Sequence, residues 1–366
     1  MKNSNTKQKK VVIQVVQHLL PGGLEIMCLD LQKFSPRDHE VHIVSLEGSA
    51  EEMAKRWPRL LSTDASLHFM GKKEGREPLL LIKLARLFKK LKASVVQTHH
   101  IGPLLYGGLA AKMAGIKTIV HTEHDAWHLE NASDKAISEF CFKWVKPILV
   151  ADADIVAQNI TSAIPTATPK IVHNGIDTRH FSPGNKAQSR QDLGLPRNVT
   201  IVGCAARMHA VKGHEVLLDA LFRLPKEVHL ALAGTGPTEQ LLKKQVIELS
   251  LQDRVHFLGQ VEDMPAFYRA IDVFCLASYE EGMPLSPLEA QSCGTRAIVT
   301  DVGGCKETLC PKSGTLIDAR NSKALSNAIN KVISTIPLAS PRDFIVERRD
   351  VTHMVDAYQK LMFAVS

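Results

Sequence analysis

Two glutamates within one short segment, Glu281 and Glu289, are the residues best placed to do chemistry in this sequence. Glu281 follows the apolar run 271–276, which predicts a buried strand, so it should stand on the loop at the carboxyl end of that strand. Open α/β sheets bind their ligands at this edge. A carboxylate held there can stabilise positive charge that develops on a substrate.

Glu289 also has a purely structural interpretation. Ser286, Pro287 and Glu289 match a capping box, with serine at the N-cap, proline at the first helical position and glutamate at the third. A capping residue contributes about 1 kcal/mol of stability and is not needed for activity. Capping does not account for Glu281.

Two further loops suit an anionic ligand. Gly22 and Gly23 follow the first predicted strand, and glycines there let backbone amides approach a phosphate at a helix N-terminus. A tight turn without a ligand would have the same composition. Arg207 and Lys212 follow the first strand of the second half, where arginine can bind a diphosphate through two hydrogen bonds and lysine acts as a point charge.

Histidines are concentrated in the first half of the chain: His99, His100, His121, His124 and His128. The spacing of the last three would place them on one face of a helix, where they could bind zinc. No neighbouring thiol or Glu-x-x-His pair supports that alternative. Histidines at strand ends also suit hydrogen bonding to a hydroxylated substrate, or simply to nearby backbone groups.

The composition is that of a globular protein with room for two cores: 366 residues, 45% apolar and 23% charged. Gln14, Gln17 and His18 interrupt the early apolar run, which predicts a short tail and a first strand instead of a signal peptide. Seven cysteines without a Cys-x-x-Cys pair favour buried thiols in a reducing cytoplasm over disulfides.

The net charge of +7 permits an anionic partner. Segment 77–92 predicts an amphipathic helix, with leucines on one face and Lys83, Arg86 and Lys90 on the other. Such a helix either docks on an anionic membrane or packs as an outer helix with a solvated basic face. Aromatic residues make up only 5% of the chain and form no stacking platform, so nucleic acid is not a predicted partner.

Short apolar runs alternate with helical segments twice along the chain, which predicts two doubly wound α/β domains with parallel sheets. A polar, turn-rich stretch separates the two halves, and apolar residues at helical spacing predict a C-terminal helix. The predicted strands are 11–17, 41–45, 66–70, 93–98, 118–121, 153–157, 170–173, 199–204, 228–233, 255–258, 271–276, 296–300 and 314–317.

In this order, the motifs resemble those of the retaining family 4 glycosyltransferases, the group 1 enzymes of the GT-B fold. The segments that carry the resemblance are 22–23, 120–122, 173–177, 207–213, 257–259, 281–294 and 300–304. The resemblance implies two Rossmann-like domains that face a cleft. Residues 1–181 would form the acceptor-side domain and 182–345 the nucleotide-sugar domain, with 346–366 crossing back onto the first.

The resemblance also implies roles for individual residues. Glu281 and Glu289 correspond to the two acids of the family's Glu-x7-Glu signature, the first facing the donor sugar and the second the ribose. Arg207 and Lys212 would bind the donor diphosphate, and His121 would lie beside the transferred sugar; these three and Glu281 form the implied catalytic set. The implied donor-binding set is Gly22, Gly23, Asn174, Arg207, Lys212, Gly259, Glu281, Gly282, Met283, Pro284, Leu285 and Glu289.

The implied reaction moves a hexosyl-type sugar from a nucleotide diphosphate sugar to a hydroxyl of a glycan or lipid-linked acceptor, with retention, in bacterial cell-surface polysaccharide or lipopolysaccharide synthesis. UDP-sugar is expected over GDP-sugar. Fixed cations at the leaving phosphate can act without a metal, and no Asp-x-Asp stands near the donor residues, so neither metal nor cofactor is predicted.

We therefore expect a cytoplasmic enzyme whose 77–92 helix contacts the inner face of the membrane. Two alternatives remain open. A sugar-nucleotide epimerase of similar fold needs a related donor site but no acceptor. A non-enzymatic protein that binds through its basic surface would have no use for Glu281 and Glu289.

Overall fold

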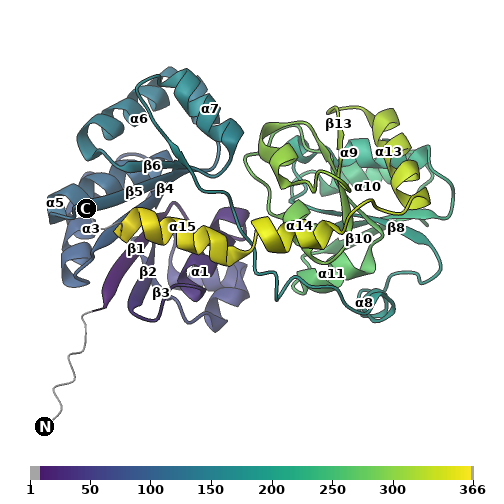
Figure 1. Ribbon diagram of the computed structural model, residues 1–366, viewed down its shortest axis with the longest axis horizontal. Helices are drawn as coiled ribbons and strands as arrows, with labels where there is room; N and C mark the ends of the chain where they lie inside the picture. The colour runs from purple at the N-terminus through teal and green to yellow at the C-terminus, as the bar shows by residue number, and fades with distance from the viewer. Residues whose placement is uncertain (1–8, 364–366) are drawn as a thin grey trace, which may run out of the picture. The chain divides into compact units, whose positions relative to one another are not determined.

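The chain folds into two compact units (Figure 1). The computed structural model describes residues 9–363. Unit 1 comprises the described chain up to Gly175 together with the part from Val351 onward, and unit 2 is Ile176–Asp350. The chain thus leaves unit 1 before the 181–182 boundary expected from the sequence, and it returns after residue 346.

Unit 1 is built on a seven-stranded parallel sheet in the order β3-β2-β1-β4-β5-β6-β7. The strands are β1 Lys10–Val16, β2 His39–Ser45, β3 Ser66–Phe69, β4 Val95–His99, β5 Thr118–Glu123, β6 Ile148–Ala151 and β7 Lys170–Ile171. The α-helices are α1 Gly23–Lys33, α2 Ala50–Arg56, α3 Leu79–Lys90, α4 Ile101–Pro103, α5 Leu109–Ala114, α6 Ala132–Val145, α7 Asp154–Ala163 and α15 Val351–Phe363. Shorter turns of helix are η1 Pro58–Ser62, η2 Leu104–Gly108 and η3 Trp127–Glu130.

Alternate residues of β1 point to opposite faces of the sheet of unit 1. Val12 and Val16 pack in a core with α1 and α15, whereas Ile13 and Val15 pack in a second core with α3, α5 and α6. Although α15 is the last helix of the chain, it lies beside α1 on this sheet (Figure 1). The predicted C-terminal helix is therefore part of the first unit.

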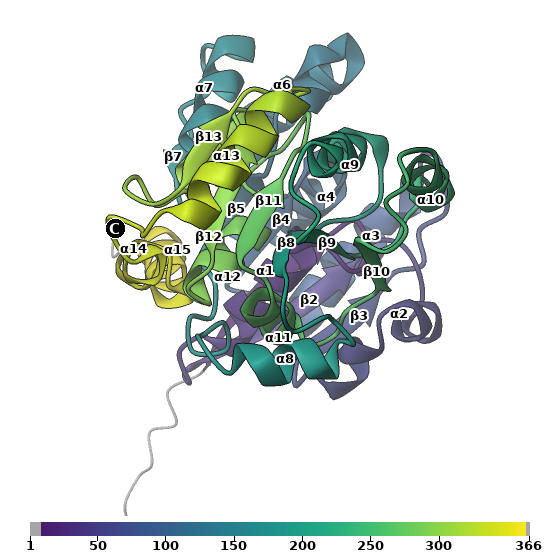
Figure 2. The same ribbon diagram turned by 90° about the vertical axis from the view of Figure 1, so that its right-hand side faces the viewer.

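Unit 2 is built on a six-stranded parallel sheet in the order β10-β9-β8-β11-β12-β13. Its strands are β8 Thr200–Ala205, β9 Val228–Ala233, β10 Val255–Gly259, β11 Val273–Leu276, β12 Arg296–Thr300 and β13 Thr315–Ile317. Its helices are α8 Lys186–Asp192, η4 Ala210–Lys212, α9 His214–Phe222, α10 Glu239–Glu248, α11 Met264–Ala270, α12 Ser286–Ser292, η5 Gly303–Thr308, α13 Ser322–Ser334 and α14 Pro341–Arg348. Figure 2 shows α9, α10 and α13 on one side of the strands and α8, α11 and α12 on the other.

The predicted fold class, two doubly wound parallel-sheet domains, is confirmed. The predicted strand at 153–157 is wrong, because this segment forms the start of α7 and the true strand is β6. Strand β6 pairs with β5, and Ala153 then takes the N-cap position of the helix. Val156, Ala157 and Ile160 form the buried stripe of α7, a spacing that fits a helix and not a strand.

The strand order reverses between β1 and β4 in unit 1, and between β8 and β11 in unit 2. In open α/β sheets, ligands bind at such switch points, outside the carboxyl ends of the strands. The loops that follow β8 and β11 therefore define the candidate site of unit 2. Within residues 9–363, none of the helices has the length and apolar character needed to cross a membrane.

Candidate active site

The loops after β8 and β11 touch at the switch point of unit 2. Gly213 ends the first loop with a φ of 62°, and a Cβ on it would come within 2.1 Å of the carbonyl oxygen of Ala277. The Tyr279 N–H donates to the Val211 carbonyl at 2.7 Å. Only glycine permits both this backbone conformation and this approach without displacing the second loop. The contact brings Lys212 next to the loop that carries the predicted glutamate.

Lys212 and Glu281 form an ion pair at this point, with 2.7 Å between Nζ and Oε1. Ser278 Oγ donates to the same carboxylate oxygen at 2.6 Å. The side chain of Glu281 is 9% exposed and that of Lys212 is 19% exposed, so water and salt screen the pair only weakly. The pair therefore presents one fixed negative and one fixed positive charge at the carboxyl ends of β8 and β11.

A third loop, which follows β12, fixes the backbone beneath this carboxylate. Gly303 has a φ of 48°, and a Cβ on it would lie 1.7 Å from the Glu281 carbonyl oxygen. The Gly304 N–H donates to the Gly282 carbonyl at 2.7 Å. The two glycines act as positioning residues for Glu281. Their signal in the sequence is a Gly-Gly pair that begins three residues after the end of a strand.

Arg207 stands on the same loop as Lys212 but is exposed. Its guanidinium has no hydrogen-bond or ion-pair partner within the described part of the chain, so it is available to a phosphate group. Gly259, at the end of β10, has a φ of 64° and open space where a side chain would begin. Its carbonyl accepts the Gly234 N–H at 2.7 Å, which joins the ends of β9 and β10.

The capping-box interpretation of the 286–289 segment is wrong. Helix α12 begins at Ser286, and Leu285 occupies the cap position with a helical backbone and no side-chain capping hydrogen bond. Ser286 therefore cannot act as the extended cap residue that the motif requires. Glu289 is buried, and its Oε2 accepts a hydrogen bond of 2.6 Å from the Tyr268 hydroxyl. Burial, together with the charge of Glu289, raises the pKa of Tyr268 well above its ordinary value, so the phenol remains a donor.

The loop residues predicted to bind the donor differ in how far they are exposed to solvent. Met283 and Leu285 are buried, whereas Gly282 and Pro284 are half-buried. The two apolar side chains are thus the shielded part of the loop. Gly282 and Pro284 lie nearer the solvent, where a ligand can reach them.

His214 begins α9 directly after Gly213 and is buried. Its Nε2 lies 3.9 Å from the Cys204 sulfur. Burial, with a smaller contribution from the Lys212 charge, lowers the pKa of His214 from 6.5 to about 4. The imidazole is therefore neutral at physiological pH.

This depressed pKa predicts a loss of stability in acid. As the pH falls below 6.5, His214 becomes protonated in the unfolded chain. In the folded protein it stays neutral until about pH 4, so protonation favours the unfolded state. The resulting loss between pH 7.5 and pH 5 is about 2 kcal/mol of unfolding free energy. Denaturant unfolding of His214→Gln should show a pH dependence smaller by this amount. His209→Gln, at an exposed neighbour, is the control; an equally steep decline in His214→Gln would contradict the prediction.

The structure places His121 inside β5, away from the strand end. The ring has no exposed surface and lies against Phe142 of α6. Its Nδ1 is 2.9 Å from Thr98 Oγ1 and its Nε2 is 2.9 Å from Glu123 Oε1. The predicted position of His121 beside a transferred sugar does not agree with this burial, because both ring nitrogens already have partners inside unit 1.

The histidines do not share the helical face on which the zinc alternative depended. His121 lies in a strand, His124 follows its end and His128 lies in η3, so the three do not share a helical face. Burial would raise the pKa of Glu123, but His121 and His128 outweigh it and hold that pKa below its ordinary value. Burial lowers the pKa of His128, yet Asp125 and Glu123 outweigh this and raise it to about 10. Glu123 and His128 therefore form a charged pair within unit 1.

Two other histidines stand at the carboxyl edge of the sheet of unit 1. His100 follows β4 with a φ of 64° and a ψ of 168°, a region that residues other than glycine rarely adopt, and its side chain is 36% exposed. Strain of this kind costs about 1–3 kcal/mol and is concentrated at functional sites. His124 follows β5 with a side chain that is 10% exposed. Both histidines stand out in the sequence, but no role was predicted for either of them.

Gly22, Gly23 and Asn174 each have a local role in unit 1. Gly22 is the extended residue before α1, and a Cβ on it would come within 2.3 Å of a Glu25 carboxylate oxygen. Gly23 begins the helix. Asn174 is buried, and its Nδ2 donates to Asp152 Oδ2 at 3.0 Å. Glycine at position 22 therefore makes room for a carboxylate of its own helix.

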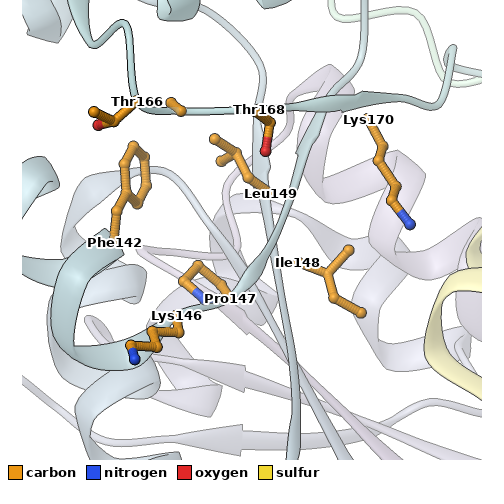
Figure 3. A pocket seen from close by; sticks show the side chains of 9 residues that line it. Phe142, Lys146, Pro147, Ile148, Leu149, Thr166, Thr168 and Lys170 are labelled. Atoms are coloured by element: carbon orange, nitrogen blue, oxygen red, sulfur yellow. The ribbon is translucent and has the colours of Figure 1, made fainter. Parts of the chain in front are cut away.

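A pocket of about 350 Å³ in unit 1 lies elsewhere (Figure 3). It opens at the amino end of β6, the edge opposite to the one at which α/β sheets bind ligands. Figure 3 shows Phe142 and Leu149 turned toward the 166–168 segment, while the amine of Lys146 points away. None of the predicted site residues is among the residues that line it.

Comparison with known proteins assigns both halves of the chain. The glycosyl transferases group 1 family matches residues 185–345, and Glycosyltransferase Family 4 matches residues 21–180. The chain is 33% identical over 189 residues to the lipopolysaccharide core biosynthesis mannosyltransferase LpsB of Rhizobium meliloti, an alignment that covers 48% of this chain and 54% of that protein. The chain therefore spans only about half the length of that relative.

A second relative aligns over more of its length. The UDP-Gal:alpha-D-GlcNAc-diphosphoundecaprenol alpha-1,3-galactosyltransferase of Escherichia coli is 27% identical over 305 residues, which cover 77% of this chain and 78% of that protein. Among solved structures, Anabaena Alr3699/HepE in complex with UDP and glucose superposes with a TM-score of 0.84 at 21% identity, over 97% of this chain and 100% of that one. This likeness shows the GT-B fold. With two family matches in sequence order and two parallel sheets of that fold, the chain belongs to the group 1, or family 4, glycosyltransferases.

Proposed function

We propose that the chain transfers a hexosyl-type sugar from a nucleotide diphosphate sugar to a hydroxyl group of a glycan or lipid-linked acceptor, with retention of configuration. The observation that carries this proposal is the Lys212–Glu281 ion pair at the switch point of unit 2. When the bond between the sugar and the phosphate breaks, the phosphate gains negative charge and the sugar ring gains positive charge. A lysine and a glutamate fixed side by side complement both changes in the transition state.

Each side chain of the site has a proposed task. Lys212 and the unpaired Arg207 neutralise the diphosphate, and Glu281, oriented by Ser278, faces the sugar ring. Glu289, held by the Tyr268 hydroxyl, accepts hydrogen bonds from the ribose. Because the two cations supply the charge that a divalent ion would bring, we propose that the reaction needs no metal.

The donor is proposed to be a UDP-sugar. This choice is supported by the HepE structures, which contain UDP, UDP with glucose, or UDP-glucose. The acceptor hydroxyl forms the new bond to the anomeric carbon, and its proton passes to the departing phosphate. For the acceptor we assign the carboxyl edge of unit 1. We also propose that His100 and His124, which stand at this edge, take the place beside the transferred sugar that was predicted for His121.

A screen of nucleotide sugars tests this function. A UDP-sugar present at 100 times its dissociation constant should raise the unfolding free energy by about 2.7 kcal/mol, and GDP- and ADP-sugars should have smaller effects. Incubation with glycan or lipid-linked acceptors in EDTA should then yield a glycoside. An epimerised sugar nucleotide as the only product would contradict the proposal, as would stabilisation by none of the donors. Activity that EDTA abolishes and manganese restores would contradict metal independence.

We propose that the protein is cytoplasmic and that helix α3 contacts an anionic membrane surface. Leu80, Leu84 and Phe88 bury the inner face of the helix. The outer face exposes Leu79 and Ile82 beside basic side chains, the combination that docks on anionic lipid.

Charge reversal of Lys83, Arg86 and Lys90 to Glu should abolish co-sedimentation with anionic liposomes, because each base near the bilayer contributes about 1 kcal/mol. The matched control reverses three exposed lysines of unit 2 and should still bind. Its positions are Lys226, Lys244 and Lys323. If the wild-type protein does not co-sediment with anionic liposomes, the result would favour a soluble acceptor over a lipid-linked one.

A further inference from the structure

Thr300 begins the 300–304 motif of the sequence, and the proposed function gives it no task. It is the last residue of β12, which pairs with β11 in the sheet of unit 2. Thr300 is only 1% exposed, so a ligand does not reach its side chain. A hydroxyl that is buried in this way can affect a ligand only through the groups that it holds.

The hydroxyl of Thr300 holds one end of the peptide group that joins Ser278 to Tyr279. Thr300 Oγ1 donates to the Ser278 carbonyl at 2.7 Å. At the other end of the same peptide group, the Tyr279 N–H donates to the Val211 carbonyl at 2.7 Å. Because a peptide group is planar, fixing its oxygen and its N–H together fixes the plane.

These two hydrogen bonds come from opposite sides of β11. In the sheet of unit 2, β11 lies between β8 and β12. Val211 belongs to the loop after β8, and Thr300 ends β12. The peptide group just beyond β11 is therefore held by both neighbours of that strand, as a residue inside the sheet would be.

The fixed peptide plane sets the direction of the Ser278 side chain. Ser278 is fully buried, and its Oγ donates to Glu281 Oε1 at 2.6 Å. Lys212 Nζ donates to the same oxygen at 2.7 Å. A carboxylate with two donors on one oxygen, one of them charged, is held firmly in one orientation.

The other carboxylate oxygen of Glu281, Oε2, is left for a ligand. Within residues 9–363 it accepts no hydrogen bond, and it is not among the buried side-chain atoms that lack a partner. The two oxygens of this carboxylate thus have different tasks: Oε1 fixes the group to unit 2, and Oε2 stays open.

We infer that Thr300 is a positioning residue for Glu281, which acts through Ser278 to keep Oε1 occupied and to present Oε2 to the ligand. The inference rests on the proposed function, in which Glu281 faces the sugar ring. A negative charge stabilises the transition state best when it is held in place before the reaction begins. Thr300 supplies part of that fixation from outside the site.

The same asymmetry bears on the amide variant of the glutamate. In Glu281→Gln, the donors from Ser278 and Lys212 require the amide oxygen at the position of Oε1. The amide N–H2 then takes the position of Oε2, so the side chain offers a donor where the wild type offers an acceptor.

Thr300→Val tests the inference, because valine keeps the branched shape of threonine and lacks the hydroxyl. The Ser278 carbonyl then loses its donor, and the peptide plane is held at one end only. We expect kcat at saturating donor to fall by about 10-fold to 100-fold, since a small displacement of a charged group weakens transition-state stabilisation. KM for the donor should change little, because Lys212 and Arg207 remain to bind the diphosphate.

Thr300→Ser is the conservative variant that should restore turnover. It keeps the hydroxyl and removes a buried methyl group, so it loses packing and retains the hydrogen bond to Ser278. Its kcat should be close to that of the wild type even if its denaturation midpoint is lower. The opposite order, with an active Thr300→Val and an impaired Thr300→Ser, would show that Thr300 acts by packing and would overturn the inference.

Thr308→Val is the matched control. Thr308 lies in the η5 turn that follows β12, is fully buried, and donates from Oγ1 to the Cys305 carbonyl at 2.6 Å. The variant therefore removes a similar hydrogen bond that does not involve Ser278 or Glu281. Its stability should fall and its kcat should not. An equal fall of kcat in Thr308→Val and Thr300→Val would overturn the specific role of Thr300.

A double-mutant cycle tests the route through Ser278. Ser278→Ala removes a donor from Oε1 directly, so its kcat should fall at least as far as that of Thr300→Val. In the Ser278→Ala background, Thr300→Val should lower kcat no further, because the group through which it acts is already lost. Losses that multiply would show that Thr300 acts by another route, against the inference.

A crystal structure of Thr300→Val gives a readout that does not depend on sugar transfer. Ser278 Oγ should move out of hydrogen-bond distance of Glu281 Oε1, and an unchanged contact would overturn the inference whatever the activity. If this contact is lost while Glu281→Gln keeps wild-type turnover, the result would count against the proposed function and leave the positioning role of Thr300 standing.

Discussion

Replacing Glu281 by Gln is expected to lower turnover by about 10² to 10³-fold while the folding stability changes little. Glutamine keeps the size of the side chain and can still accept the hydrogen bond from Ser278. It removes the charge that opposes the positive character of the sugar ring in the transition state. The loss should therefore appear in kcat measured at saturating donor, with an unchanged denaturation midpoint.

The neighbouring Glu280→Gln is the matched control, since Glu280 is exposed and carries the same charge one residue away. Its turnover should equal that of the wild type. Wild-type turnover in Glu281→Gln as well would show that the carboxylate serves only to hold Lys212. The proposed role of the ion pair in catalysis would then be lost.

Removing Lys212 should have an effect of similar size on donor use. Lys212→Ala is expected to weaken kcat/KM for the donor by about 2–5 kcal/mol, because it removes a cation from the diphosphate and leaves Glu281 next to it without a partner. Arg207→Ala should cost less, since an exposed guanidinium is better screened by water. Steady-state kinetics with varied donor concentration measure both losses.

The control for these two variants is Lys226→Ala, which removes an exposed cation from the same unit. Its donor kinetics should not change. If Lys212→Ala and Arg207→Ala both behaved like this control, the diphosphate would have to bind elsewhere in unit 2.

The sequence by itself determined the fold class and the order of the elements. Parallel strands are buried on both faces and appear as short apolar runs, so most strands were located by local pattern alone. The same reasoning placed Lys212 and Glu281 at strand ends. It failed at 153–157, where an apolar stretch of similar composition forms α7, because a short apolar run does not distinguish a strand from a buried helix face.

Only the tertiary structure decided which of these side chains meet. The Lys212–Glu281 pair exists because β8 and β11 are neighbours in the sheet, and Gly213 lets their loops touch. Residue type did not reveal that His121 points into the core while His124 stands at the strand end. Alternation along a strand sets which residues share a face, but the sheet order and the helices packed on each face decide what that face meets.

A buried hydrogen bond between Thr122 and Tyr358 shows the same limit over a longer distance in the chain. Thr122 and Tyr358 belong to β5 and α15 and lie 236 residues apart in the sequence, and neither position has a local pattern that predicts a hydrogen bond. Local periodicity records which positions are buried, because burial follows from each residue's own apolar character. The partners of a buried polar group depend on how distant elements pack, and that information exists only once the chain has folded.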